Sequence, residues 1–124
     1  MRELTLEQRI ARLERAIKNE ARELTQDMAD ELRMHLEDEL RNLGVNVTSR
    51  TVKCIAQPYN QIDIVYKNRK YTDMKFYLDI ERNTMISREV GGRLNDRVAT
   101  SPRLEVHARA IAQFIKNSFD NRLY

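Results

Sequence analysis

The clearest hydrophobic pattern in the chain lies at its amino terminus, in TLEQRIARLERAIKNE. The apolar residues Leu6, Ile10, Leu13 and Ile17 recur at steps of four, three and four, and Arg or Glu fills most positions between them. This spacing is typical of a heptad seam, a narrow apolar edge on an otherwise charged helix. Such a helix has little of its own to bury that edge against. We therefore expect residues 1–20 to form a helix tip that joins copies of the chain into a homo-oligomer.

The helical pattern broadens after this seam, which falters at residues 18–20. A ladder of apolar residues follows at Leu24, Met28, Leu32, Leu36, Leu40 and Leu43. Gly44 comes next, and glycine readily takes the left-handed conformation that closes a helix. The sequence predicts one long helix from Leu6 to Leu43, or two helices joined near Asn19 to Thr25. The broader stripe of the second part predicts docking on the core of its own domain.

Alternation of apolar and polar residues takes over after Gly44. Four strands are expected, at residues 45–57, 62–66, 74–81 and 85–90. The parity of the first strand changes between Val47 and Val52, which predicts a bulge or break around Thr48 to Thr51. The third strand is apolar on one face and polar on the other, as expected for a sheet with one solvent-exposed face. Short turn-like connections predict that neighbouring strands pair in an antiparallel meander.

A loop is expected at residues 91–101, followed by a closing helix. Ser101 and Pro102 form a helix-start signal, with a capping hydroxyl before proline at the first helical position. Leu104, Ala108, Ile111, Ile115 and Phe119 then share one helical face. The fold class is therefore α+β: a long N-terminal helix with a coiled-coil-like tip, a four-stranded antiparallel meander and a C-terminal helix. Residues 21–124 are expected to form a single domain.

Composition agrees with one compact domain in the cytoplasm. The chain has 124 residues, of which 41% are hydrophobic and 33% charged. No apolar stretch approaches the roughly 20 residues that a membrane span needs, and no signal-peptide pattern is present. We therefore expect no membrane partner. The single cysteine, Cys54, has no partner in the chain for a disulfide and is expected to be a small buried side chain.

Motifs for catalysis, metals and cofactors are missing from the sequence. It contains no glycine-rich phosphate loop, no nucleophile elbow and no His-Glu-x-x-His helix. Glu31 and His35 at four-residue spacing supply at most two ligands of one metal site. His107 stands alone on the last helix. We therefore expect a protein that is not an enzyme and holds neither a metal nor a cofactor.

Charge is distributed unevenly and points to an anionic ligand. Residues 1–43 hold 8 Lys or Arg and 11 Asp or Glu, whereas residues 44–124 hold 14 and 8. Six arginines lie between the third strand and the last helix, at Arg82, Arg88, Arg93, Arg97, Arg103 and Arg109. The planar guanidinium suits phosphate oxygens. The alternative interpretation is a solvated surface on which these arginines pair with nearby acidic side chains.

The candidate ligand-binding residues follow from charge and position. They are Arg22, Arg50, Phe76, Tyr77, Arg88, Arg93, Arg97, Arg103 and Arg109. Phe76 is also expected to be part of the hydrophobic core. Tyr77 lies on the opposite, solvent-exposed face, where it can stack on a base or simply cover the sheet. The ligand class expected from these residues is a small phosphorylated molecule.

The opening TLEQRIARLERAIKNE resembles the starts of many small bacteriophage accessory proteins. The whole order, an assembling helix, a small antiparallel sheet and an arginine-containing closing helix, is similar to the phage Thoeris anti-defence family that sequesters cyclic nucleotide signals. The resemblance implies a non-enzymatic sponge acting in the host cytoplasm. It also implies ligands such as cyclic ADP-ribose isomers or cyclic oligonucleotides, bound by arginine and aromatic side chains from adjacent protomers.

Two other functions remain open from the sequence. The order of helix, meander and helix also resembles double-stranded RNA binding domains, which suggests a nucleic-acid-binding or nuclease-inhibiting phage protein. The modest positive charge and the acidic long helix count against that function. The third possibility is a structural or adaptor oligomer in which the zipper is the function and the arginines are solvated.

Overall fold

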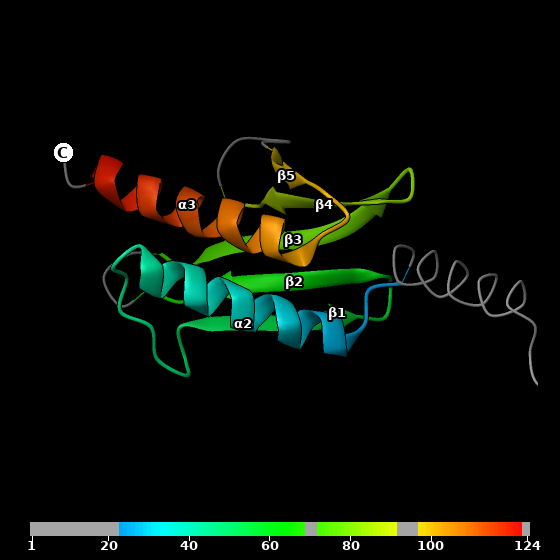
Figure 1. Cartoon of the computed structure of the whole chain (residues 1–124), viewed down its shortest axis with the longest axis horizontal. Helices are drawn as coiled ribbons and strands as arrows, with labels where there is room; N and C mark the ends of the chain where they lie inside the picture. The colour runs from blue at the N-terminus through cyan, green and yellow to red at the C-terminus, as the bar shows by residue number, and fades with distance from the viewer. Residues whose placement is uncertain (1–22, 69–71, 92–96, 123–124) are drawn as a thin grey trace, which may run out of the picture.

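The described part of the chain folds into a five-stranded antiparallel sheet with two helices packed on one of its faces (Figure 1). The computed structural model of the chain describes residues 23–68, 72–91 and 97–122. The elements in chain order are α2 (Gln26–Asn42), β1 (Val52–Gln57), β2 (Gln61–Tyr66), β3 (Met74–Glu81), β4 (Thr84–Glu89), β5 (Arg97–Thr100) and α3 (Leu104–Arg122). The α+β class predicted from the sequence is confirmed.

Helix α2 begins at Gln26 because Thr25 caps it. Thr25 is extended, with φ −101° and ψ 165°, and its hydroxyl accepts a hydrogen bond from the Met28 N–H at 3.3 Å. An uninterrupted helix from Leu6 to Leu43 is therefore wrong, and the alternative with a joint reaching Thr25 agrees with this start. The expected helix tip lies outside the described residues, together with its seam residues Leu6, Ile10, Leu13 and Ile17 and with Arg22.

The sheet is a simple meander in the order β1-β2-β3-β4-β5, with each strand pairing antiparallel to the next. The prediction of four strands is corrected to five. The additional strand, β5, lies in the segment expected to be a loop and places Thr100 opposite Ile86. A strand of four residues that is nowhere fully buried has too little alternation to stand out in the sequence.

Tight turns fix the register of the meander. Arg82 and Asn83 connect β3 to β4 and both have positive φ, 53° and 63°, as a two-residue hairpin turn of type I′ requires. Asn60, in the turn before β2, has φ 56°, and its side-chain oxygen accepts a hydrogen bond from the Leu24 N–H at 2.6 Å. The predicted break between Thr48 and Thr51 is confirmed as a turn. The expected first strand at residues 45–57 is corrected, because the strand begins only at Val52 and residues 45–48 belong to the connection from α2.

One hydrophobic core lies between the sheet and the two helices. Its fully buried side chains include Leu32, Leu36 and Leu40 of α2, Ile62, Ile64, Phe76 and Leu78 of the sheet, and Ile111 and Ile115 of α3. Phe76 packs edge-on against Phe114 with ring centroids 5.7 Å apart. Neither described helix has a stretch long and apolar enough to cross a membrane.

The start of α3 differs slightly from the sequence prediction. The Ser101 hydroxyl accepts a hydrogen bond from the Arg103 N–H at 3.1 Å, but the helix begins at Leu104 and Pro102 lies in the preceding bend. The carbonyl of Ser101 is instead bonded by the imidazole of His107, at 2.7 Å from Nε2. This contact ties the bend to the first turns of α3.

Candidate functional site

The arginines that the sequence grouped together do not converge on one site. Arg88 lies on the helix-free face of the sheet, where Nη2 is 2.7 Å from Glu81 Oε2 and Nε is 4.0 Å from Asp79 Oδ1. Arg97 of β5 reaches the same Glu81 oxygen at 3.7 Å. Arg82 lies in the β3–β4 turn. Two acidic side chains of β3 therefore neutralise the arginines of β4 and β5.

The arginines of α3 and its approach are paired as well. Arg103 bonds Glu105 through Nε at 2.7 Å and also through Nη2. The pKa of Glu105 is lowered, first by a hydrogen bond from its own main-chain N–H and then by Arg103. Arg109 Nε lies 3.6 Å from Glu39 Oε1 of α2. These pairs agree with the alternative interpretation of surface arginines balanced by acids, and Arg93 lies outside the described residues.

The two aromatic candidates lie on opposite faces of β3. Phe76 is 1% exposed in the core, so no ligand can reach it without opening the fold. Tyr77 lies on the helix-free face, between its cross-strand neighbours Asp63 and Arg88. Cations and acids alternate on this face, with Lys53, Lys75, Arg88 and Arg97 against Asp63, Asp79 and Glu81. A face of mixed charge lacks the continuous basic surface that a duplex would require.

Arg50, one of the predicted site residues that the structure describes, lines a hollow. It lies in the Thr48–Thr51 turn, where its N–H donates to the Thr48 hydroxyl at 3.3 Å. The Thr48 N–H donates to the Thr51 hydroxyl at 2.8 Å, and the two hydroxyls are 3.2 Å apart. Threonine hydroxyls that bond nearby main-chain groups stabilise such turns. The turn therefore holds the Arg50 backbone while its side chain stays exposed.

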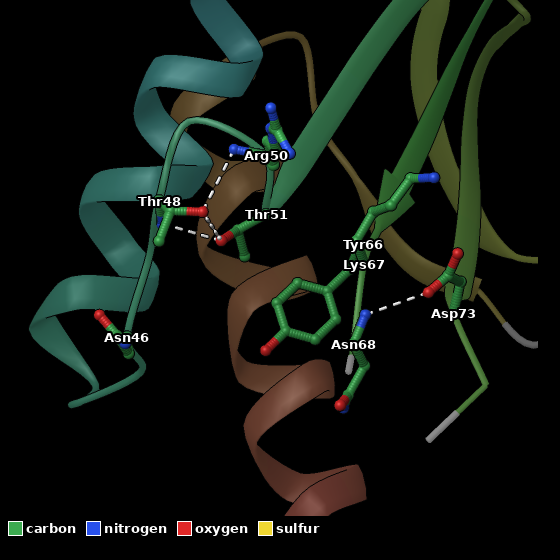
Figure 2. A pocket seen from close by; sticks show the side chains of 8 residues that line it. All are labelled: Asn46, Thr48, Arg50, Thr51, Tyr66, Lys67, Asn68 and Asp73. Carbon is green, nitrogen blue, oxygen red and sulfur yellow. Dashed lines mark hydrogen bonds between the residues drawn. The ribbon is translucent and has the colours of Figure 1, made fainter. Parts of the chain in front are cut away.

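The hollow beside Arg50 has a volume of about 490 Å³ and a mainly polar lining. It lies between the α2–β1 connection and the end of β2, as Figure 2 shows. Its lining residues are Asn46, Thr48, Arg50, Thr51, Tyr66, Lys67, Asn68 and Asp73. The Asp73 carboxylate accepts a hydrogen bond from the Asn68 N–H at 3.0 Å, which fixes the far side of the hollow. We call this set the Arg50 hollow.

The chemistry of the Arg50 hollow combines cations, neutral donors and one carboxylate. Within the described residues, no ion pair involves Arg50 or Lys67. Tyr66 is 6% exposed and packs against Phe119, with ring centroids 5.6 Å apart, and burial raises the pKa of its phenol. The phenol therefore stays protonated at neutral pH. The hollow offers two positive charges and several donors to an anionic ligand, with Asp73 as an acceptor.

Charge and position in the sequence point to Arg50 but not to most of its neighbours. Lys67, Asn68 and Asp73 belong to the β2–β3 connection, for which the sequence predicts only a short turn-like connection between paired strands. The signal that identifies them is strand pairing: Val52 faces Tyr66, so residues before β1 must lie beside residues after β2. The two threonines three positions apart in Thr48-Ser49-Arg50-Thr51 are a second signal, typical of a hydroxyl-stabilised turn.

Among the residues that the structure describes, the side chains most often used in catalysis or metal binding are not gathered at an open site. Within residues 23–68, 72–91 and 97–122, no cluster of three or more His, Cys, Asp or Glu side chains could hold a metal ion. Burial raises the pKa of the Cys54 thiol to about 12. Ser87 and His107 are hydrogen-bonded at 2.9 Å, but both are 0% exposed. This pair therefore links β4 to α3 and does not face a substrate.

The chain was compared with protein families, curated proteins and solved structures. No family model, curated protein or solved structure matches it. The fold and the Arg50 hollow define the chain as an α+β domain with a polar hollow at one end of its sheet. The resemblance to cyclic-nucleotide sponges therefore stays a prediction.

Proposed function

We propose that the chain is a non-enzymatic binding protein for a small phosphorylated ligand of the nucleotide class, held in the Arg50 hollow. One contrast carries the proposal. Arg88, Arg97, Arg103 and Arg109 each lie within 4.0 Å of a carboxylate. Arg50 and Lys67 line one polar hollow and take part in no ion pair of the described residues. Their charge is therefore available to an external anion.

The lining of the hollow suits the two ends of a nucleotide. A guanidinium can present two parallel N–H donors to a phosphate, and an ammonium adds a point charge. Asp73 repels phosphate but accepts hydrogen bonds from sugar hydroxyls or a base amino group. The phosphate is therefore placed near Arg50 and Lys67, with the sugar or base toward Asp73. A volume of about 490 Å³ lies in the range typical of small-molecule sites.

The resemblance to phage sponges supplies the specific ligands to test. It favours cyclic ADP-ribose isomers and cyclic di- and trinucleotides, and it favours a role in trapping an immune signal in the host cytoplasm. Binding alone is sufficient for such a role. The proposal needs only one protomer for the Arg50 hollow, and contributions from a second protomer remain part of the resemblance.

The experiment is a thermal-shift screen of the full chain with these cyclic nucleotides, followed by calorimetry on each compound that raises the melting temperature. A ligand at 100 times its Kd adds about 2.7 kcal/mol of stability. Arg50→Ala should weaken binding at least tenfold, since it removes charge-assisted hydrogen bonds worth about 1.5–3 kcal/mol. Intact ligand recovered after denaturation would support a binder and not an enzyme.

Arg109→Ala is the matched control. Arg109 is 71% exposed and lies on α3, where it pairs with Glu39 away from the hollow. Arg109 was a candidate binding residue from the sequence. The two variants therefore compare an arginine chosen from the sequence alone with one that lines the Arg50 hollow. Binding within twofold of the unmodified chain is expected for Arg109→Ala. The proposal fails if Arg109→Ala abolishes binding while Arg50→Ala preserves it, or if no cyclic nucleotide raises the melting temperature.

A further inference from the structure

A second hollow, of about 510 Å³, adjoins the Arg50 hollow, because Arg50 and Lys67 line both of them. It lies against β1, and its lining residues are Arg33, Ser49, Arg50, Val52, Lys53, Cys54, Ile55 and Lys67. We call this set the Ile55 groove. The two cations to which we assign phosphate binding therefore border two hollows, and a ligand confined to the Arg50 hollow leaves the other one empty.

The accessible surface of the Ile55 groove is cationic and apolar. Four of its eight lining residues are Arg or Lys and none is an acid. Val52 and Cys54 are buried, whereas Ile55 is 39% exposed. Asp63 lies opposite Ile55 on β2 but does not line the groove, and side-chain amides of β1 and β2 donate to both of its carboxylate oxygens. A ligand in this groove therefore meets Ile55, one serine and the cationic side chains.

The main chain on both sides of Ile55 is held by α2. The amide nitrogen of Gln26 donates to the Cys54 carbonyl at 3.2 Å, and its amide oxygen accepts from the Ala56 N–H at 2.9 Å. A side-chain amide is chemically one peptide unit, so Gln26 covers this part of the β1 edge in the manner of a neighbouring strand. The apolar end of the groove is therefore formed before a ligand arrives.

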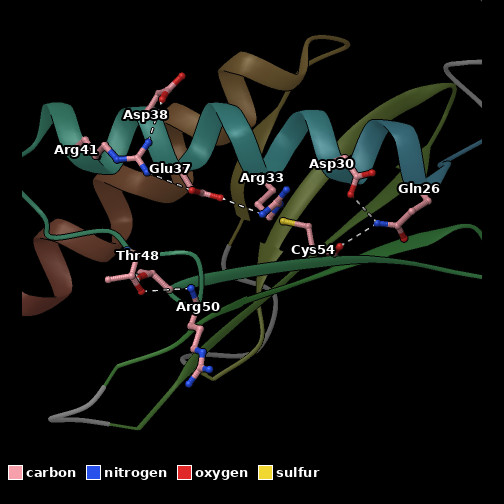
Figure 3. A network of polar contacts seen from close by, with 10 residues as sticks. Gln26, Asp30, Arg33, Glu37, Asp38, Arg41, Thr48, Arg50 and Cys54 are labelled. Carbon is pink, nitrogen blue, oxygen red and sulfur yellow. Dashed lines mark hydrogen bonds and ion pairs between the residues drawn. The ribbon is translucent and has the colours of Figure 1, made fainter.

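The charge of the Ile55 groove is concentrated at one end. Figure 3 shows Arg33 directed from α2 toward Cys54, while Arg50 projects from the turn before β1. Arg33 contacts Glu37 at 3.4 Å, whereas no ion pair of the described residues involves Arg50, Lys53 or Lys67. Along the chain these unpaired cations at positions 50 and 53 come first, and the exposed apolar side chain at position 55 follows.

We propose that the ligand is a dinucleotide, two nucleosides joined through phosphate, and that it spans both hollows. Its phosphate lies between Arg50 and Lys67. One nucleoside enters the Arg50 hollow toward Asp73, and the base of the second nucleoside lies on Ile55. This assignment rests on the proposed function, since it uses the same phosphate-binding cations, and it adds the size and the two-armed shape of the ligand.

The order of side chains in the Ile55 groove matches the order of groups in a nucleotide. Cations lie next to the shared phosphate position, and Ile55 offers apolar surface farther along the same face of β1 as Lys53. A base has two apolar faces, and a guanidinium can stack on its planar ring. Each hollow has a volume typical of a small-molecule site, so the two together accommodate two nucleosides.

The test is calorimetry on the full chain with AMP, ADP, diadenosine diphosphate and cyclic di-AMP. ADP has the same two phosphates as diadenosine diphosphate and more negative charge, but only one nucleoside. If charge alone set the affinity, ADP would bind at least as tightly as the dinucleotides. We expect at least one of the linear and cyclic dinucleotides to bind at least tenfold more tightly than ADP, and the comparison of these two shows which form the hollows accept.

Variants of Ile55 test where the second base lies. Ile55→Asp places a carboxylate beneath that base and should weaken dinucleotide binding at least tenfold. Ile55→Ser removes the apolar surface without adding charge and should weaken it at least threefold. Both variants should bind AMP within twofold of the unmodified chain, which also shows that the Arg50 hollow is still folded. The matched control is Val106→Asp on α3, where Val106 is 36% exposed and lines neither hollow; it should bind every ligand within twofold.

Failure of the dinucleotide assignment differs from failure of the proposed function. The assignment is overturned, with the Arg50 hollow still a nucleotide site, if AMP or ADP binds as tightly as both dinucleotides. It is also overturned if Ile55→Asp leaves dinucleotide binding unchanged. The absence of binding by all four nucleotides would instead overturn the proposed function, and the dinucleotide assignment with it.

Discussion

The imidazole of His107 and the hydroxyl of Ser87 form a buried hydrogen bond of 2.9 Å that joins α3 to β4. The other ring nitrogen, Nε2, lies 2.7 Å from the Ser101 carbonyl, which can only accept. Nε2 therefore carries the proton in the neutral ring, so Nδ1 accepts from the Ser87 hydroxyl. All the hydrogen-bonding capacity of the neutral ring is used, and a second proton would leave Nδ1–H facing a hydroxyl already oriented as a donor.

The first prediction is a loss of stability in mild acid that depends on His107. Burial lowers the pKa of His107 in the folded chain, and the bond to the Ser101 carbonyl only partly opposes this shift. The unfolded chain takes up the proton near pH 6.5, before the folded chain does. The contribution of His107 to the free energy of unfolding is therefore complete above pH 6.5. It falls as the pH drops below 6.5, by at most about 1.4 kcal/mol per pH unit.

Urea unfolding at pH 7.5, 6.5 and 5.5 measures this dependence. His107→Gln should be less stable at pH 7.5 but should show a flatter slope, since it has no proton to gain. His35→Gln is the control, because His35 lies 39% exposed beside Glu31. A slope unchanged in His107→Gln would contradict the assignment.

The second prediction concerns the thiol of Cys54. Burial raises its pKa to about 12, so little thiolate is present at pH 8. Alkylation by iodoacetamide should be at least a hundredfold slower in the folded chain than in urea. A Cys54→Ser/Lys75→Cys double variant moves the thiol to an exposed site on β3 and should react at nearly the unfolded rate. Rapid labelling of native Cys54 would show that the β1 edge opens far more often than this packing implies.

The third prediction separates structural arginines from binding arginines. Arg88 is 17% exposed and contacts both Asp79 and Glu81. Arg88→Ala leaves Asp79 without its cation and leaves Glu81 with Arg97 alone, which should cost about 1 kcal/mol of stability. Arg103→Ala removes an exposed pair formed within one short segment and should cost less than about 0.5 kcal/mol. Nucleotide binding should change by less than twofold in both variants, and a larger change would place these arginines in the site.

The fourth prediction tests the role of Gln26 as a cover for the β1 edge. Gln26→Ala removes both bonds to β1 and should lower the free energy of unfolding by about 1–2 kcal/mol. It also frees two main-chain groups on an edge strand, which promotes association between chains. Light scattering during slow heating should therefore rise earlier. Gln113→Ala, which removes only a bond to Asn117 within α3, should aggregate like the unmodified chain.

The fifth prediction addresses the heptad seam. Leu13→Asp places a charge in the apolar edge and should lower the mass measured by sedimentation. Arg15→Asp introduces the same residue outside the seam and should leave the mass unchanged. Nucleotide binding by a Leu13→Asp monomer would show that the hollow is complete in one protomer. Loss of binding with the assembly would instead support a pocket shared between protomers, as the resemblance implies.

The sequence was sufficient for the elements with strong periodicity. The four-residue ladder of α2 and the alternation of β3 each determine which face is buried, so their placement follows from pattern alone. β5 could not be found in the same way, because Val98 and Ala99 are only partly buried and the strand has four residues. Its pairing with β4 depends on tertiary structure that no local window contains.

The arginine site was harder to predict, because the number of charged residues in a segment does not show where their side chains lie. Glu81 and Arg88 are seven residues apart, and only the two-residue turn at Arg82 and Asn83 brings them onto the same face. The register that follows from that turn places Glu81 opposite Thr84 and Arg88 opposite Tyr77, so the two side chains share a face and the long arginine spans the distance between them. Arg50 carried no special signal among the arginines, and its importance comes from Lys67, which the antiparallel β1–β2 pair places beside it.

The meander order also has a consequence for how the chain folds. Every strand pairs with its neighbour in sequence, so the sheet can form by successive local hairpins with little loop-closure entropy. The contact between α2 and α3, in contrast, joins segments such as Glu39 and Arg109 that lie far apart in the chain. We expect α3 to dock last and the Ser87–His107 bond to be absent from the folding transition state. Loss of that bond should then accelerate unfolding and leave the refolding rate almost unchanged.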